Sequence, residues 1–440
     1  MSMYKKQYPG VYTPREQEIL DRLNEQLKAQ VGKPAMFGAG DADPTLMALY
    51  AKNWDPWNPL YNDPEYAKNT KWGGVISIPC WKEPGAMFPT LPMDFGDRMT
   101  DRANLGGAFE ILKPIYAGDK LEARVGLGRI VDITPEEGGD SHIFYLEGSG
   151  ELYNQNNELV MRGIGRGRNG FATYADDYTG ERIYGLHMGG PGGPGGGPGG
   201  PGAPGGKGGP GAPPPPPGMG STSAEDNMVF TDEIWEQIFE MWKSEKIRGA
   251  EKRYWEDVNV GDEPQTLCSG PISEMDMIRF HGMQLMQQGP FRDSLMNPAM
   301  RANLENFRNK YGVYYSDMAT HYCGQGEGKN PILFNTTNRN LLIRVVTNWM
   351  GDDGWLKKID WHFSGVGADS FLDKIPYMKG KGPTNHGSCG QCMLLHGYVT
   401  DKYISEEGEH MVDLTCWAET WDKKLTQIIG VSVVLPTKGE

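Results

Sequence analysis

The sequence of 440 residues is long enough for two ordinary domains, each with its own hydrophobic core. Lys and Arg number 43 against 57 Asp and Glu, so the formal net charge is −14. This acidic balance argues against nonspecific nucleic-acid binding, which requires cations that displace counterions from phosphates. It still allows a local basic pocket for a phosphorylated ligand.

The N-terminal segment, MSMYKKQYPGVYTPREQ, has no apolar run and does not predict a signal peptide. The longest apolar runs, such as QIIGVSVVLP, are much shorter than a membrane-spanning helix. Six cysteines are dispersed through the long chain, a usage typical of reduced thiols. Together these features predict a cytoplasmic protein.

The first half begins with a helix signal. Thr13 is a suitable N-cap, Pro14 suits the first helical position, and Glu16 completes a capping box. The segment EILDRLNEQLKAQV then places apolar residues at helical spacing. Two strand-rich segments follow, residues 108–133 and 141–171. The second contains an Asn-rich turn at Asn154–Asn157, which predicts an antiparallel hairpin.

A Gly- and Pro-rich tract, residues 189–220, divides the sequence into halves. Its triplet register slips at Gly195-Gly196-Gly197 and it ends in five prolines, so it is typical of a linker rather than of collagen. We expect an N-terminal domain over residues 1–186, a linker over 187–224 and a C-terminal domain over 225–440.

The second half repeats the plan of the first. Residues 231–247 and 338–350 have helical patterns, and strands are expected over 390–404 and 409–436. The closing turns, ELYNQNNEL and ETWDKKL, share an acid, an aromatic residue and a leucine after the turn. The sequence therefore predicts an internal duplication of an α+β unit.

Several segments resemble the MaoC-like acyl-CoA dehydratases, which are relatives of the R-specific enoyl-CoA hydratases. In the first half they are NPLYNDPEYAKNTKWGGVI and KPIYAGDKLEARVGLGRIVDI; in the second, YWEDVNVGDE, GPISEMDMIRF, VTNWMGDDGWLKKI and GEHMVDLTCWAETWDKKLTQIIGVSVVLP. The resemblance implies tandem hot-dog folds, two per chain, each with an antiparallel sheet wrapped around a long central helix. It also implies an acyl-CoA thioester in the groove between them, with coenzyme A as part of the substrate and no other cofactor.

The reaction that the resemblance implies is addition or removal of water across the 2,3-bond of an enoyl-CoA, by a paired Asp and His. Asn58, Pro59 and Asp63 match the family motif, and Asp55 supplies the leading carboxylate with one extra residue of spacing. Tyr61 occupies the histidine position, and a phenol with a pKa near 10 is a poor general base. The dyad is therefore degenerate. The alternative is that Asp55, Asn58 and Asp63 only cap turns and helices.

The second half offers His281 with Asp293 as a displaced dyad, although a lone histidine beside an apolar stretch is more often a packed or surface residue. In relatives a His-Gly pair starts the central helix and supplies an oxyanion N–H. Here Asn335 stands in that region, and the backbone N–H groups of Thr336 and Thr337 are the expected donors to the thioester oxygen.

Arg166 and Arg168 lie two residues apart and would face the same side of a strand, where they could contact coenzyme A phosphates. The alternative is a solvated strand end. His386, Cys389 and Cys392 have ligand-like spacing, but no second CxxC supplies a closed zinc site, so we expect no metal.

Three functions remain open from the sequence. The first is a hydratase or dehydratase, a lyase. The second is a non-catalytic acyl-CoA-binding subunit of a heteromeric hydratase, and the third is a hot-dog thioesterase. The expected partners are an acyl-CoA thioester and either a second copy of the chain, as in a dimer, or another MaoC-like subunit; neither nucleic acid nor a membrane is expected.

Overall fold

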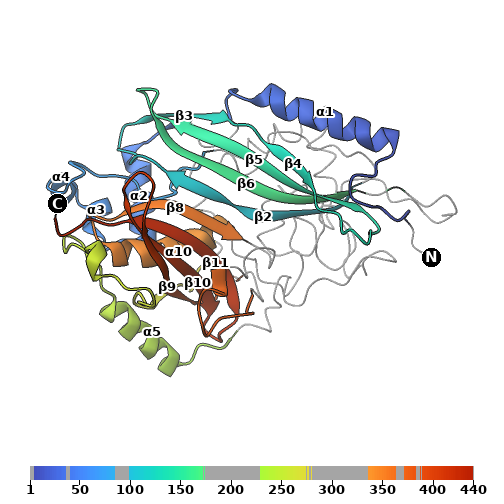
Figure 1. The fold of residues 1–440 in the computed structure, drawn as a ribbon. Helices are drawn as coiled ribbons and strands as arrows, with labels where there is room; N and C mark the ends of the chain where they lie inside the picture. The colour runs from blue at the N-terminus through green and yellow to red at the C-terminus, as the bar shows by residue number, and fades with distance from the viewer. Residues whose placement is uncertain are drawn as a thin grey trace, which may run out of the picture.

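The computed structural model describes residues 4–35, 40–84, 99–171, 173, 228–273, 275–276, 279, 335–362, 371–382, 387 and 389–439. Within these residues, an eleven-stranded sheet organises the fold (Figure 1). Its order is β1-β3-β5-β6-β2-β8-β11-β10-β9-β7, and β4 pairs with β5. Every pairing of neighbouring strands is antiparallel.

The first six strands belong to the N-terminal half: β1 (Gly40–Asp41), β2 (Met99–Ile111), β3 (Lys120–Val125), β4 (Arg129–Asp132), β5 (His142–Tyr153) and β6 (Leu159–Phe171). The other five belong to the C-terminal half: β7 (Leu267–Ser269), β8 (Trp355–His362), β9 (Met393–Ile404), β10 (His410–Thr420) and β11 (Leu425–Val434). The hairpins expected at the two closing turns are β5–β6 and β10–β11.

The two halves join where β2 pairs with β8, and we call this pairing the seam. Its register runs from Gly106 opposite His362 to Glu110 opposite Lys358. Gly106 has a φ of +115°, and a Cβ added there would lie 2.0 Å from the carbonyl oxygen of Trp361. The close approach of the two strands therefore requires glycine at this position.

Helix α1 (Pro14–Gln30) begins with the expected capping box, in which Thr13 and Glu16 exchange hydrogen bonds. Its apolar face packs on the sheet, where Leu20 and Leu23 join Phe144 of β5 in one buried cluster. The helix therefore covers one end of the N-terminal half (Figure 1).

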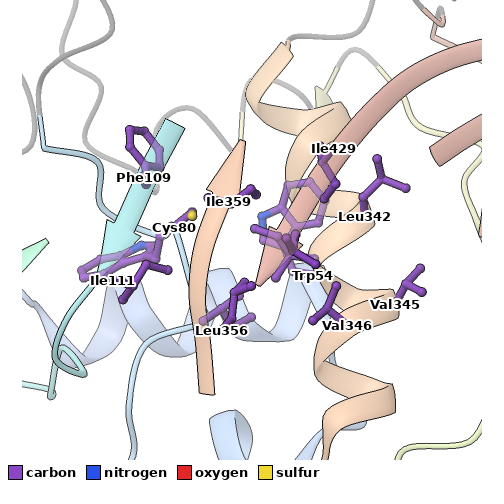
Figure 2. Packing of buried hydrophobic residues seen from close by; sticks show 14 of the residues in the cluster. Trp54, Cys80, Phe109, Ile111, Leu342, Val345, Val346, Leu356, Ile359 and Ile429 are labelled. Atoms are coloured by element: carbon purple, nitrogen blue, oxygen red, sulfur yellow. The ribbon is translucent and has the colours of Figure 1, made fainter. Parts of the chain in front are cut away.

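The main core lies between the sheet and the helices α2 (Pro44–Trp54) and α10 (Asn335–Met350). Figure 2 shows Trp54 of α2 close to Leu342 and Val346 of α10, with Ile429 of β11 above them. Side chains of both halves thus share a single hydrophobic core. Helix α5 (Asp232–Ser244) packs separately at the β7 edge through Ile238.

A sheet that wraps a helical layer in each half is the architecture of tandem hot-dog folds, so the fold class predicted from the sequence is confirmed. The expected long central helix is present in the C-terminal half as α10, which has 16 residues. In the described part of the N-terminal half, helix α2 is followed by the short helices α3 (Pro59–Asn62) and α4 (Pro64–Lys68). Each of these three helices begins at a proline, which cannot donate the hydrogen bond that would continue a preceding helix.

The linker predicted over 187–224 lies outside the described residues, so its bounds stay a prediction. None of the helices within the described ranges combines the length and apolar character needed to cross a bilayer.

Candidate active site

The segment from Asp55 to Asp63 connects α2 to α4 through tight turns. Asp55 ends α2, and the Asn58 side chain caps α3 by accepting a hydrogen bond from the Leu60 N–H at 3.1 Å. Asp63 caps α4 by accepting from the Glu65 and Tyr66 N–H groups at 3.0 and 3.1 Å. Asn58 and Asp63 therefore act locally as helix caps.

Asp55 differs from its neighbours because its carboxylate has no such role. The residue is 2% exposed, and its carboxylate oxygens make no hydrogen bond of normal geometry with the described residues, although the Asn58 side chain lies near them. Burial raises the pKa of Asp55 to about 6; the positive charge of Arg344 and the nearby Asn58 side chain oppose this, and the negative charge of Glu245 adds to it. Near pH 6 this carboxyl group can both accept and release a proton.

The loop backbone that carries Asp55 is held by a neighbouring amide. The Asn62 side chain donates to the Asp55 carbonyl oxygen at 2.7 Å and to the Asn58 carbonyl oxygen at 2.9 Å. These two bonds fix the turn between α2 and α3 while leaving the Asp55 carboxylate outside the network.

Tyr61, at the histidine position of the family motif, is 4% exposed. Burial raises its pKa above the usual range, and the charges of Asp55 and Asp352 add to the effect. The phenol therefore stays protonated at neutral pH. It can donate a hydrogen bond but cannot serve as a general base.

The same segment is fastened to the C-terminal half just after α10. The Tyr66 hydroxyl donates to the Asp352 carboxylate at 2.5 Å, and the Trp72 indole N–H donates to the Asp352 carbonyl oxygen at 2.8 Å. Lys71 adds a bond to the Asp353 carbonyl oxygen at 2.7 Å. The candidate residues of the first half therefore lie where the two halves meet.

Two arginines of α10 reach the same boundary. Arg339 is fully buried, pairs with Glu83 at 2.5 Å, and lies over the rings of Phe109 and Trp361 at 5.2 and 4.6 Å. Arg344 pairs with Glu245. The sequence signal for both was present, since they are the two charged residues of this helix, but only the structure identifies their partners.

Several predicted site residues are not placed by the structure. His281 and Asp293 lie outside the described residues. Asn335 and Thr336 open α10 and Arg168 lies in β6, but their side chains are not among those described. Thr337 is 1% exposed, and its hydroxyl has no hydrogen-bond partner in the described part of the chain.

Arg166 is bound to the C-terminal half. Its guanidinium donates to both carboxylate oxygens of Asp360, at 2.5 and 3.1 Å, and its Nη1 lies 3.3 Å from His362 Nε2. This pairing neutralises the charge that we expected to meet coenzyme A phosphates, and that role stays a prediction.

The structure describes part of the motif HGSCGQC, which spans residues 386–392. Cys389 and Cys392 are buried, and His386 lies outside the described residues. Among the residues that the structure describes, no cluster of three or more His, Cys, Asp or Glu side chains could hold a metal ion.

A cleft of about 480 Å³ lies on the sheet face that carries Glu110, Lys358 and Ser432. Phe109 and Ile359 also line the cleft and belong to the core with α10, so the cleft lies mainly over the face to which their neighbours Glu110 and Lys358 point. None of the predicted site residues lines it. We therefore base the candidate site on the Asp55 carboxyl group, which is buried and has a raised pKa, and not on this cleft.

No protein-family model and no curated protein matches the sequence. Among solved structures, the chain is similar to a MaoC-like dehydratase, with 13% identity and a TM-score of 0.49 over 94% of this chain and 100% of that one. It is also similar to a MaoC domain dehydratase from Chloroflexus aurantiacus, with 12% identity and a TM-score of 0.46 over 93% and 96%. A Mycobacterium tuberculosis protein with a double hotdog fold gives 10% identity and a TM-score of 0.45 over 92% and 96%. The structures that the chain resembles thus include the family named from its motifs.

Proposed function

We propose that the protein binds acyl-CoA thioesters and adds or removes water across the 2,3-bond of an enoyl-CoA. The observation that carries the proposal is the Asp55 carboxylate, which is buried and has a pKa raised to about 6. A buried carboxyl group that titrates near neutrality is typical of a catalytic acid or base.

In this proposal Asp55 accepts a proton from water as the water oxygen bonds to C3 of the enoyl thioester. The carboxylic acid so formed returns the proton to C2, which completes the addition; dehydration runs through the same steps in reverse. Tyr61, which stays protonated, serves as a hydrogen-bond donor near Asp55. The N–H groups of the first turn of an α-helix lack intrahelical partners, so those at the start of α10, including Thr336 and Thr337, suit the enolate oxygen.

The position of Tyr61 also favours a second candidate. Because a buried phenol with a raised pKa cannot take a proton from water at neutral pH, the intact family dyad is absent from this loop. A non-catalytic acyl-CoA-binding subunit, paired with a MaoC-like subunit that carries the dyad, fits the same observation.

The test uses trans-2-enoyl-CoAs of different chain lengths and follows the absorbance of the conjugated thioester. Loss of the absorbance with the purified chain alone supports the hydratase, whereas loss only after addition of a MaoC-like partner supports the binding subunit. Release of free thiol from a saturated acyl-CoA would indicate a thioesterase. The same preparation, examined by sedimentation, tests the expected dimer.

We also place the protein in the cytoplasm. In support, none of the five cysteines in the described part of the chain forms a disulfide. Labelling of these thiols in freshly lysed cells would test their reduced state.

A further inference from the structure

Two adjacent side chains near the start of α10 are bound to the N-terminal half. The Asn340 side-chain amide donates to the Tyr50 hydroxyl of α2 at 2.7 Å. Arg339 Nη2 donates to Glu83, which precedes β2 in the chain, at 2.5 Å. Arg339 Nε also donates to Asn340 Oδ1 at 3.0 Å, so the two contacts form one network. We call these four residues the anchor.

The anchor is buried within the main core. Each of its four residues is at most 9% exposed. The Arg339 guanidinium also lies over the rings of Phe109 of β2 and Trp361 of β8, one strand from each side of the seam. A buried amide or guanidinium that loses its partner still bears the cost of desolvation, so these bonds hold the start of α10 in one position.

The anchored residues support the first turn of the helix. In an α-helix each N–H donates to the carbonyl four residues earlier, so the N–H groups of residues 339–341 bond to the carbonyls of residues 335–337. The N–H groups of Thr336 and Thr337 have no partner within the helix. Fixing residues 339 and 340 therefore fixes the direction in which these free N–H groups point.

Two buried polar atoms point to a ligand at this end of α10. Thr337 is 1% exposed, and its hydroxyl has no hydrogen-bond partner in the described part of the chain. Arg339 Nη1 is also buried and lacks a partner among the described residues. Native proteins rarely leave buried polar atoms unpaired, so the start of α10 is suited to receive a polar group.

We propose that the four residues of the anchor are positioning residues, which hold the start of α10 so that its free N–H groups meet the thioester oxygen. The inference rests on the proposed function for its catalytic consequence. The anchoring itself stands on the two hydrogen bonds of Asn340, the ion pair of Arg339 and the burial of all four residues. Tyr50 and Glu83 give the N-terminal half a part in shaping this site.

Asn340 and Asn348 form a matched pair of substitution sites on one helix. Both are 5% exposed. The Asn348 amide donates to Glu245 at 2.9 Å, about two turns beyond the anchor. Asn340→Ala removes the anchor bond, whereas Asn348→Ala removes a similar bond away from the first turn. Tyr50→Phe deletes only the hydroxyl and tests the same anchor bond from the other half.

Amide hydrogen exchange, followed by NMR on the full-length protein, measures the anchoring without any substrate. We expect Asn340→Ala and Tyr50→Phe to speed exchange at residues 339–341 by about tenfold or more. Asn348→Ala should leave these amides within about threefold of wild type. The double variant Tyr50→Phe/Asn340→Ala should exchange no faster than Asn340→Ala, because both substitutions remove one shared bond.

Steady-state hydration of a trans-2-enoyl-CoA measures the catalytic consequence. Donors that bind the enolate oxygen more tightly than the ground-state carbonyl act on kcat. Asn340→Ala and Tyr50→Phe should therefore lower kcat by about tenfold or more, with KM changed by less than about threefold. Asn348→Ala should keep both constants within about twofold of wild type. A network that only stabilised the fold would not separate the two asparagine variants in this way.

The two readouts let the two proposals fail independently. Faster exchange at residues 339–341 together with a lower kcat supports both. Faster exchange in a protein whose wild type hydrates no enoyl-CoA upholds the anchoring and overturns the proposed function. If wild type turns over and Asn340→Ala matches Asn348→Ala in exchange and kcat, the inference is overturned and the proposed function stands. Faster exchange with an unchanged kcat overturns the positioning role. If Asn340→Ala does not fold, Tyr50→Phe carries the same test.

Discussion

Arg166 of β6 and Asp360 of β8 form a two-pronged ion pair that bridges the two halves on the outer face of the sheet. The strand between them, β2, carries no side chain into the pair: Arg166 Nη1 approaches the Gly107 carbonyl oxygen at 3.5 Å. The pair therefore reinforces the seam, where a single line of backbone hydrogen bonds joins the two halves of the sheet.

We expect Arg166→Gln to destabilise the protein by about 1–3 kcal/mol at pH 7. The lower part of this range reflects solvent screening, because the Asp360 side chain is 34% exposed. Burial tends to raise the pKa of Asp360, but His362 and Arg166 outweigh burial and lower it. A depressed carboxyl pKa stabilises the fold above the unfolded pKa, and this contribution is lost as the pH falls through the folded value.

The difference between wild type and Arg166→Gln should therefore shrink on acidification from pH 5 to pH 2. Urea unfolding across this range measures it. Arg162→Gln, at a more exposed pair, serves as the control. If both variants lose the same free energy of unfolding at pH 7, the Arg166–Asp360 pair stabilises the protein no more than the Arg162–Glu110 pair does.

Gly106 gives a test of the seam backbone. Gly106→Ala forces a left-handed backbone angle on a non-glycine residue and places Cβ 2.0 Å from the Trp361 carbonyl oxygen. We expect a loss of about 3 kcal/mol or more. Gly74→Ala is the control, since its added Cβ would meet nothing within 4 Å. Equal unfolding midpoints for the two variants would show that β2 and β8 are not paired in this register.

Asp55→Asn should stabilise the protein at high pH. Its folded pKa, about 6, lies above the ordinary value for Asp, so folding disfavours the ionised form. The penalty is absent below pH 4 and develops as the pH rises through 6, where it reaches about 2–3 kcal/mol. Chemical unfolding at pH 4 and pH 8 should therefore show a gain for the variant only at pH 8. A gain of the same size at both values would mean that the carboxyl group titrates normally.

Tyr61→His tests whether the loop is a degenerate hydration site. A histidine beside Asp55 supplies the base that the phenol cannot, and we expect hydration of enoyl-CoA to rise at least about tenfold. Tyr61→Phe keeps the ring without a titrating group and should give no gain. A histidine variant that is folded yet no faster than the phenylalanine variant would argue that this loop does not contact the reacting bond.

The elements that the sequence predicts well are those whose signals are local. The capping box at Thr13 and Glu16 starts α1 as expected, and the turns at Asn154–Asn157 and Asp422–Lys424 close hairpins. The motif at Asn58 and Asp63 locates two helix starts. Each depends on residues a few positions apart, so composition and spacing are sufficient.

The features that the sequence did not predict join distant residues. Arg344 and Glu245 are 99 positions apart, and Arg339 and Glu83 are 256 apart. Nothing in local spacing identifies such partners, because they depend on how the two halves pack. For the same reason the sequence does not show that Arg166 pairs with Asp360, a carboxylate across the seam. The raised pKa of Asp55 likewise arises from burial, which no local pattern reports.

In the proposed reaction Asp55 exchanges the proton with water and with C2 of the thioester, and the rate of its asparagine variant tests this role. Hydration of a trans-2-enoyl-CoA is measured for wild type, Asp55→Asn and Asp63→Asn, the last of which keeps a capping side chain on an exposed position. We predict that Asp55→Asn lowers the rate by about a hundredfold or more, whereas Asp63→Asn stays within about twofold of wild type. An Asp55→Asn protein that is folded and retains the wild-type rate would contradict the claim.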